Sequence, residues 1–416
     1  MSKANIAFRT DASVSIGTGH LMRCLTLANA LAARGARCTF LCRNLPESLA
    51  ARLGNDGHDL IALPQADAGQ DDLPHSAWLG TTMAEDARQV LPFLKKLQPT
   101  WLIVDHYALD ARWTDAVHGT AKVLVIDDLA DRMLTADLLV DSTAGRYPNA
   151  YDAVLFNDAP RLIGPTFALL RPEFAALRAT SLARQREPVR RILITMGGVD
   201  AGNATGKFLE KLTGRGFALT AVIGATSPNI ASLTDQVASL PDARLILGAP
   251  EMASLMAASD ICIGAAGSTA WERCALGLPA LTVVLAENQE TVAQGLEASG
   301  AARTIKPSIT AAELFALIQT LDVKAMSDAA SALSDGKGVD RVAAIMQVLP
   351  DLEIRPATLN DGEIVWRWRS SGGAERFYKS GQAVSLSDHL EWFARALAQP
   401  ERQLFVVEMN QTPVAH

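Results

Sequence analysis

The stretch DICIGAAGSTAWERCALGLPALTVV, residues 260–284, places an apolar run on each side of a segment with helical composition. Gly, Ser and Thr after the first run are typical of a turn that leads from a strand into a helix. Neither run alternates with polar residues, as expected for parallel strands whose sheet is covered on both faces. The stretch therefore predicts a strand–helix–strand unit of an α/β sheet.

Similar units extend from this stretch toward both ends of the chain and form two series. The later series has strand-like runs at residues 190–198, 217–224, 243–248, 260–267 and 278–284. The earlier series has runs at residues 4–9, 37–42, 101–105, 122–128 and 137–141, with a helix expected at 20–34. We therefore predict the α/β class, with two Rossmann-like domains whose strand ends open into a shared cleft.

The two series set the predicted domain boundaries in a chain that is too long for a single core. Residues 1–170 form the N-terminal domain and residues 191–349 the C-terminal domain. Between them, residues 171–190 contain prolines and several arginines and are predicted to be the connection. Residues 350–416 are richer in Trp and charge, so we expect a third, short segment there.

The composition excludes several classes of protein. The chain has 416 residues, of which 49% are hydrophobic, and a net charge of -7 without a basic cluster, so no nucleic-acid partner is expected. It has no apolar stretch of membrane-spanning length and no secretory signal at its start, which predicts a cytoplasmic protein. The five cysteines form no CxxC pair, so we expect buried thiols, and no metal or cofactor.

The loop DASVSIGTGH, residues 11–20, precedes the first expected helix. Gly17 and Gly19 allow the tight turn that brings His20 to the helix start. The helix dipole disfavours an imidazolium there, so His20 can accept a proton from water as a general base. The alternative is a histidine that only bonds its own turn, but the loops described next favour the catalytic role.

Two loops of the C-terminal domain have small residues between a strand and a helix. Gly198 lies in the first, where backbone N–H groups can approach a diphosphate. The second contains Gly267, Ser268 and Thr269, which would face phosphate. Glu272 follows, and its carboxylate can accept hydrogen bonds from both ribose hydroxyls. The competing interpretation is a capping box, in which Glu272 only completes the helix start.

Other candidates follow neighbouring strands. Asn288 and Gln289 lie just beyond a strand of the C-terminal domain, where neutral amides can orient a sugar or base without repelling phosphate. Asp11 and Tyr107 lie at strand ends of the N-terminal domain and are predicted to contact the substrate. Weaker candidates are the remaining acidic residues at these strand ends, Asp105, Asp127 and Asp128. One carboxylate of the adjacent pair is expected to cap the following turn.

Seven blocks occur in order within residues 4–348: RTDASVSIGTGHLMRC, VDHYALD, VIDDLADR, LIGPTFALLRPEF, ITMGGVDAGN, GAAGSTAWERCALGLPAL and AENQ. Together they resemble the UDP-2,4-diacetamido-2,4,6-trideoxy-beta-L-altropyranose hydrolase family of pseudaminic acid biosynthesis. The resemblance implies a GT-B-like fold. It also implies inversion at the anomeric carbon, with water replacing UDP.

The same resemblance implies roles for individual residues. The family's catalytic histidine falls on His20, and its sugar-side amide falls on Asn288. Its nucleotide-binding elements fall on three places, Gly198, the turn 267–269 and Glu272. One departure is GGVDAGN in place of GGSDPxN, because Val199 lacks the hydroxyl with which a serine would contact phosphate. Backbone contacts would survive that change.

From Leu352 onward, the sequence IRPATLNDGEIVWRWR resembles the beginning of a GNAT acetyltransferase. In that fold a loop for the pyrophosphate of acetyl-CoA follows a strand, here expected at residues 404–409, and the sequence ends at His416 without such a loop. The resemblance therefore implies an incomplete acetyltransferase segment with one uncovered strand edge. We expect no acetyl-CoA binding.

The loops favour a hydrolase that acts on a small-molecule UDP-sugar, and the resemblance implies that this sugar is a 2,4-diacetamido-2,4,6-trideoxy sugar. The alternative is a GT-B glycosyltransferase that moves the sugar from UDP to an acceptor, which would need an acceptor surface that is not evident in the N-terminal domain. A nucleotide-sugar-binding regulator would retain Glu272 and its loops but would not need His20.

Overall fold

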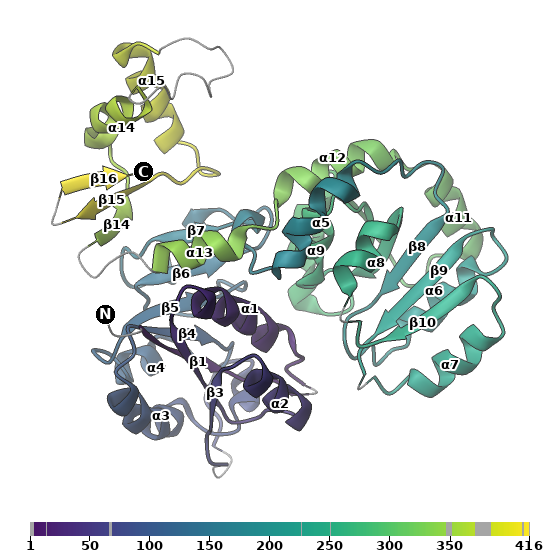
Figure 1. The fold of residues 1–416 in the computed structure, drawn as a ribbon, viewed down its shortest axis with the longest axis horizontal. Coiled ribbons are helices and arrows are strands. Elements are labelled where there is room, and N and C mark those ends of the chain that lie inside the picture. The colour runs from purple at the N-terminus through teal and green to yellow at the C-terminus, as the bar shows by residue number, and fades with distance from the viewer. Residues whose placement is uncertain are drawn as a thin grey trace.

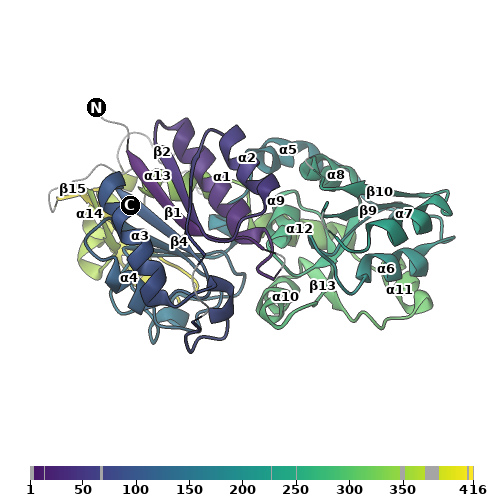
Figure 2. The same cartoon turned by 90° about the horizontal axis from the view of Figure 1, so that it is seen from below.

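The computed structural model describes residues 4–13, 15–65, 69–225, 227–249, 251–346, 352–370, 384–409 and 412–415. Figure 1 shows an N-terminal and a C-terminal α/β domain side by side, with a third segment on the N-terminal domain. In both views this segment lies away from the C-terminal domain (Figures 1 and 2). The predicted α/β class with Rossmann-like domains is confirmed.

The N-terminal domain is built on a parallel sheet with strand order β3-β2-β1-β4-β5-β6-β7. Its strands are β1 (Asn5–Thr10), β2 (Arg37–Cys42), β3 (Asp59–Ala62), β4 (Trp101–Asp105), β5 (Lys122–Ile126), β6 (Leu138–Asp141) and β7 (Arg161–Ile163). The helices are α1 (Gly19–Ala33), α2 (Glu47–Asn55), α3 (Met83–Leu97) and α4 (Ala111–Ala116), with 3-10 helices η1 (Ser76–Leu79), η2 (Pro148–Tyr151) and η3 (Pro165–Phe167). Apolar side chains from both faces of the sheet are buried in separate core clusters, as expected for covered parallel strands.

The C-terminal domain has a second parallel sheet with strand order β10-β9-β8-β11-β12-β13. Its strands are β8 (Arg191–Thr195), β9 (Ala218–Ile223), β10 (Ala243–Leu247), β11 (Ile261–Ala265), β12 (Ala280–Val283) and β13 (Ala302–Ile305). The helices are α5 (Pro172–Leu182), α6 (Ala204–Leu212), α7 (Ile230–Ala238), α8 (Met252–Ala258), α9 (Thr269–Ala275), α10 (Glu290–Ala298), α11 (Ala311–Gln319) and α12 (Val323–Leu333), with η4 (Glu287–Gln289). Residues 260–284 form β11, α9 and β12, the unit expected from their sequence.

The chain passes between the two domains twice. Helix α5, inside the segment 171–190 expected to be the connection, packs on α8 and α9 and buries Phe174 in the C-terminal core. Helix α13 (Gly338–Met346), inside the range 191–349 expected for the C-terminal domain, packs instead on α1 of the N-terminal domain (Figure 1). There Trp101 Nε1 donates a hydrogen bond to the carbonyl of Met346 at 2.9 Å. Each crossing element therefore belongs by its packing to the domain that it covers.

The third segment has an antiparallel sheet with strand order β14-β15-β16. Its elements are β14 (Leu352–Pro356), η5 (Leu359–Asp361), α14 (Gly362–Arg369), α15 (Leu386–Leu397), β15 (Phe405–Met409) and β16 (Thr412–Ala415). Strand β15 matches the strand expected at 404–409, but it pairs with β14 on one side and β16 on the other. The expectation that an edge of this strand is uncovered is therefore corrected, because residues after it turn back and pair with it.

Two further predictions from the composition concern membrane-spanning segments and the cysteine thiols. Within the described part of the chain, no helix combines the length and the apolar composition that crossing a membrane requires. The cysteines are free and buried, which confirms the prediction of buried thiols.

Candidate active site

The strand order of each sheet reverses beside its first strand. Strand β1 lies between β2 and β4, and β8 lies between β9 and β11. In open α/β sheets, ligands bind outside the carboxyl ends of the strands at such reversals. The loop that follows β1 leads to His20 at the start of α1, and the loop that follows β8 contains Gly198, so the topology puts both predicted loops at ligand-binding positions.

The loops of the two domains meet at the domain junction. A Cβ atom built on Gly19 would lie 3.7 Å from Ser268 Oγ, so the start of α1 faces the turn before α9. A second approach occurs where a Cβ atom on Gly145 would lie 3.4 Å from the Cα atom of Gly295. Figure 2 shows α1 on the side of the N-terminal domain that borders the C-terminal domain. The structure thus brings the predicted histidine loop and the predicted phosphate turn together.

His20 is oriented by a buried carboxylate. Its Nδ1 atom lies 2.6 Å from Oδ1 of Asp105, at the end of β4, and 9% of the His20 side chain is exposed. Burial alone would raise the pKa of Asp105, but the charges of Arg23 and His20 hold it well below its ordinary value. The permanent carboxylate favours the tautomer with the proton on Nδ1, which leaves Nε2 to accept a proton.

Arg23 fixes the same carboxylate from the next turn of α1. Residues three apart share one face of a helix, so Arg23 follows His20 toward the sheet. Its Nε donates to Asp105 Oδ2 at 2.6 Å, and its Nη1 donates to Asp128 Oδ2 at 2.9 Å. The Tyr107 hydroxyl donates to the other Asp128 oxygen, and the Tyr107 ring meets the His20 ring edge-on with centroids 4.5 Å apart. His20 is therefore held on several sides.

Asp11 is placed differently from the prediction. It is fully buried, and its Oδ2 accepts a hydrogen bond from Arg9 Nη1 at 2.8 Å. Its Oδ1 accepts from the backbone N–H groups of Arg43 and Asn44. The Asp11 carboxylate therefore braces the loop after β2, and it is not presented to a ligand. The sequence could not separate these roles, because both place an acidic residue at a strand end.

Two further predictions concern turns of the N-terminal domain. Asp127 Oδ2 accepts from the N–H groups of Leu129 and Ala130, so the expected capping of that turn by one carboxylate is confirmed. Gly17 has φ +78°, a conformation that favours glycine, and its N–H donates to the Ser13 carbonyl at 2.8 Å. Gly17 thus shapes the loop that leads to His20.

In the C-terminal domain, the loop after β8 presents backbone. Gly197 has φ +88°, and a Cβ atom on Gly224 would clash with the Gly198 carbonyl, so both positions favour glycine. Asp200 accepts hydrogen bonds from the N–H groups of Ala204 and Thr205. Because a carboxylate already occupies the start of α6, a diphosphate here would meet the glycine backbone before that helix.

The turn before α9 is braced from below by Arg273. This side chain is 1% exposed, donates from Nη2 to the Ala265 carbonyl at 3.0 Å, and donates from Nη1 to Thr269 Oγ1 at 3.3 Å. A Cβ atom on Gly264 would lie 2.7 Å from its guanidinium, so glycine makes room for the charge. No sequence pattern identified Arg273, although an arginine just after the predicted phosphate turn is a usable signal.

The capping-box interpretation of Glu272 is wrong. Helix α9 has Ser268 as its N-cap, without a side-chain cap, so Thr269 and Glu272 do not occupy the positions that a capping box needs. The Glu272 side chain is 18% exposed, and Arg171 Nη2 lies 4.0 Å from its Oε1, beyond hydrogen-bond length. Burial raises the pKa of Glu272 to about 7. Such a carboxylate is suited to hydroxyl donors from a ligand.

The amides after β12 are the remaining candidates. Gln289 Oε1 accepts from the N–H of Leu285 at 3.0 Å, so this amide closes its own loop. Asn288 lies in η4, and its side chain falls outside the part that the structure describes.

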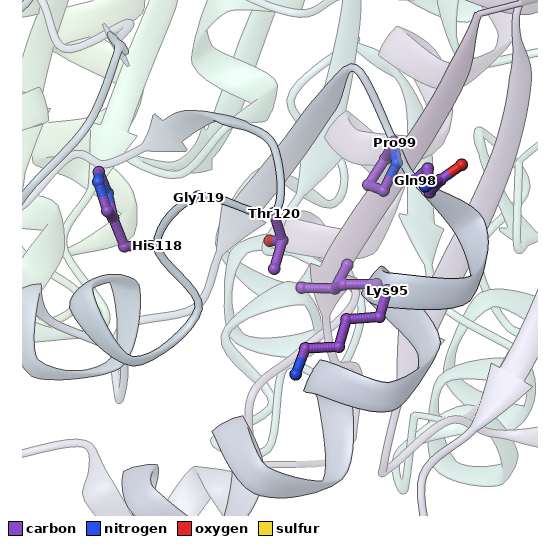
Figure 3. Close-up of a pocket in the computed structure, with 7 residues that line it drawn as sticks. Lys95, Gln98, Pro99, His118, Gly119 and Thr120 are labelled. Atoms are coloured by element: carbon purple, nitrogen blue, oxygen red, sulfur yellow. The ribbon is translucent and has the colours of Figure 1, made fainter.

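A separate hollow of about 400 Å³ lies at the amino ends of β4 and β5, opposite the edge that carries His20. Figure 3 shows Lys95, Gln98, His118 and Thr120 around it. Within the described ranges, no group of three or more His, Cys, Asp or Glu side chains is arranged to hold a metal ion.

The first test of this geometry is the replacement Glu272→Ala, which should weaken UDP binding by about 10- to 100-fold, because hydrogen bonds to a charged group contribute about 1.5–3 kcal/mol. The same variant should bind a 2′-deoxy analogue about as well as the wild-type protein does. Titration calorimetry with both ligands measures the difference. Equal weakening of both ligands would contradict contact with the ribose diol.

The pKa of Glu272 also makes binding depend on pH. Hydroxyl donors favour the ionised carboxylate, so UDP affinity should rise as pH increases through about 7, by roughly tenfold between pH 6 and pH 8. Glu272→Gln should lack this rise in affinity. Because the ionisation of UDP affects both proteins equally, comparing their pH profiles isolates the contribution of Glu272. A rise of equal size in Glu272→Gln would contradict this account.

The same pKa predicts an effect on stability of the opposite sign. A folded-state pKa raised above the ordinary value of 4.5 means that stability is lost as pH rises toward and through about 7. Glu272→Gln should therefore have a higher Tm than the wild type at pH 8 and a similar Tm at pH 4.5. A thermal melt at both pH values measures this, and a lower Tm of the variant at pH 8 would show that the charge stabilises the fold.

Comparisons with known proteins relate parts of this chain to glycosyltransferases and to a nucleotide-sugar hydrolase. Residues 208–345 match the glycosyltransferase family 28 C-terminal domain. A protein of Methanocaldococcus jannaschii, itself uncharacterized, is 22% identical over 93% of this chain and 77% of its own length. The UDP-2,4-diacetamido-2,4,6-trideoxy-beta-L-altropyranose hydrolase of Campylobacter jejuni is 24% identical over 71% of this chain and 97% of its own length.

Among solved structures, MurG of Acinetobacter baumannii superposes with a TM-score of 0.58 at 16% identity, over 83% of this chain and 99% of its own length. At this identity the likeness shows the fold alone. The chain therefore has the GT-B fold of glycosyltransferases, and its sequence relates it to proteins that act on nucleotide sugars.

Proposed function

We propose that this protein is a UDP-sugar hydrolase that cleaves the anomeric C–O bond of a UDP-linked 2,4-diacetamido-2,4,6-trideoxy sugar in pseudaminic acid biosynthesis. The observation that carries the proposal is His20, whose Nδ1 is held by Asp105 and whose loop faces Ser268 across the domain junction. The similarity to the Campylobacter jejuni hydrolase along 97% of that protein supports the substrate class.

In the proposed reaction, the oxygen of a water molecule attacks the anomeric carbon while His20 Nε2 takes one of its protons. The bond from that carbon to the UDP oxygen breaks, and its electron pair leaves with UDP. Asp105 stabilises the imidazolium that forms, which then returns its proton to solvent. Since water attacks from the side opposite UDP, the free sugar has inverted configuration.

The leaving UDP is held by the C-terminal domain in this mechanism. The glycine backbone at Gly198 and the turn 267–269 donate N–H groups to the diphosphate, and the buried Arg273 beneath that turn favours its charge. Glu272 accepts from the ribose hydroxyls. The base and the leaving group thus belong to different domains, so only a substrate at the junction meets both.

A GT-B glycosyltransferase is the second candidate, because residues 208–345 match the glycosyltransferase family 28 C-terminal domain. The same site would act, with an acceptor hydroxyl in place of water. The two functions differ in one requirement, since a transferase needs an acceptor molecule before UDP is released.

The position of bond cleavage tests the mechanism. Hydrolysis in water enriched with ¹⁸O should place the label on the anomeric hydroxyl of the sugar and leave UDP unlabelled, because His20 delivers water to the carbon. Mass spectrometry of both products measures the label. Label in the phosphate of UDP would mean attack at phosphorus, and it would contradict this mechanism.

A further inference from the structure

Aromatic rings lie beside His20 in addition to its charged partners Asp105 and Arg23. The Trp78 ring stacks on Tyr107 with centroids 5.8 Å apart, and the His75 ring lies 4.4 Å from Trp78. The Trp78 centroid is 6.4 Å from that of His20. We call His75, Trp78 and Tyr107 the aromatic wall.

Two rings of the wall, His75 and Trp78, lie on the connection between β3 and α3, and Tyr107 follows β4. Leu79 of η1 is fully buried in the core, and Ser76 is 3% exposed. Asp71 accepts from the N–H of Met83 at 2.7 Å and thereby ties the connection to the start of α3. Rings fixed in this way can contact a ligand without first losing rotamer freedom.

The wall is more than core packing. Core aromatics of this domain such as Trp113 and Tyr151 are fully buried, while His75 and Trp78 are both partly exposed. The connection that carries them, residues 63–82, is longer than joining β3 to α3 needs. A partly exposed, preorganised ring surface next to the base is therefore available to a ligand.

A sugar whose anomeric carbon lies near His20 must place its remaining substituents against neighbouring groups. Asp105 is fully buried, and its carboxylate already bonds Arg23 and His20, so it is not presented to a sugar hydroxyl. The aromatic wall presents ring faces, which favour methyl and methylene groups. Substituents with methyl groups suit the wall, and hydroxymethyl groups lose hydrogen bonds to water against it.

We propose that the aromatic wall selects the sugar, and that Trp78 is the specificity-determining residue that receives its methyl-bearing substituents, those of a deoxy position or an acetamido group. This inference rests on the proposed function, because it assumes that the sugar lies beside His20. It adds a residue that neither the sequence patterns nor the reaction itself requires.

The test compares two donors, a UDP-2,4-diacetamido-2,4,6-trideoxy sugar and UDP-N-acetylglucosamine, which carries hydroxyl groups at two of the positions concerned. Trp78→Ala should lower kcat/KM for the first donor by about 10- to 100-fold, mainly through KM, and for the second by less than about threefold. Trp78→Phe should restore most of the difference. The Kd for UDP alone should not change.

A matched control is Trp392→Ala, which removes another partly exposed tryptophan, on α15 of the third segment. It should leave both kcat/KM values unchanged. Equal losses on both donors in Trp78→Ala, weaker binding of UDP alone, or no loss on the first donor would overturn the inference.

A binding measurement separates this inference from the proposed function. In saturation-transfer NMR, the methyl groups of the bound diacetamido donor should receive strong saturation from the wild-type protein and much less from Trp78→Ala, with the uridine signals unchanged. This result would support the inference about the wall even if the protein never released UDP. Absence of UDP release would contradict only the proposed hydrolase function. The inference about the wall would be overturned if the uridine signals received saturation and the methyl signals did not. It would also be overturned if this donor did not bind.

Discussion

Replacing His20 with alanine is expected to lower kcat for UDP release by about 10²- to 10⁴-fold, the usual contribution of a general base. UDP should still bind with nearly the wild-type Kd, because the groups proposed to hold it belong to the C-terminal domain. Steady-state kinetics and titration calorimetry on one preparation measure both quantities.

His118→Ala is the matched control for this variant. His118 lies at the hollow of Figure 3, at the opposite edge of the sheet from His20, and it should be replaceable without loss of kcat. Unchanged turnover in His20→Ala would exclude this residue as the base. Loss of UDP binding along with turnover would mean that His20 holds the substrate.

Replacing Asp105 with asparagine is expected to lower kcat by about 10²- to 10⁴-fold with UDP binding retained, since the carboxylate sets the histidine tautomer. An asparagine amide can donate to Nδ1 of His20, which would place the imidazole proton on Nε2, where it blocks proton transfer from water. Kinetics and calorimetry measure the two effects, and a thermal melt measures the accompanying loss of stability around Arg23.

Asp127→Asn is the matched control, because Asp127 is also a fully buried strand-end carboxylate but caps a turn and pairs with Arg132. It should lower Tm and leave kcat within about threefold of wild type, as expected for a residue outside the reacting groups. If both variants lost kcat in proportion to their loss of Tm, the role of Asp105 would be structural.

The α/β fold was predictable because its signals are local. Apolar runs without alternation, several of them followed by a glycine-containing turn, indicate parallel strands, and residues 260–284 form the expected unit. The loops that follow such strands lie at one edge of the sheet, which is why Gly19 and Ser268 could be proposed as parts of one site.

The partners of His20 were not predictable from local patterns. Asp105 is 85 residues away in sequence, and its contact with His20 depends on β4 pairing directly with β1. The same pattern of an acidic residue at a strand end describes Asp11, which the structure buries against Arg9. Only the strand order separates these two carboxylates.

The structure also differs from the sequence-based predictions where only tertiary packing decides the position of an element. The amphipathic helix α13 could cover either sheet, and its packing on α1 follows from the path of the chain. Trp78 lies in a long connection without periodicity, so nothing in the sequence places it beside His20. The pairing of β16 with β15 likewise has no separate signal in the sequence.

The central claim is that water is the acceptor. The most direct test incubates the purified protein with the UDP-linked diacetamido sugar in buffer without any acceptor and follows UDP and free sugar over time. The account predicts multiple turnovers, with UDP and free sugar formed in equal amounts. Release of UDP only after an acceptor is added would show a transferase, and binding without release would show a nucleotide-sugar-binding protein; either result would contradict the claim.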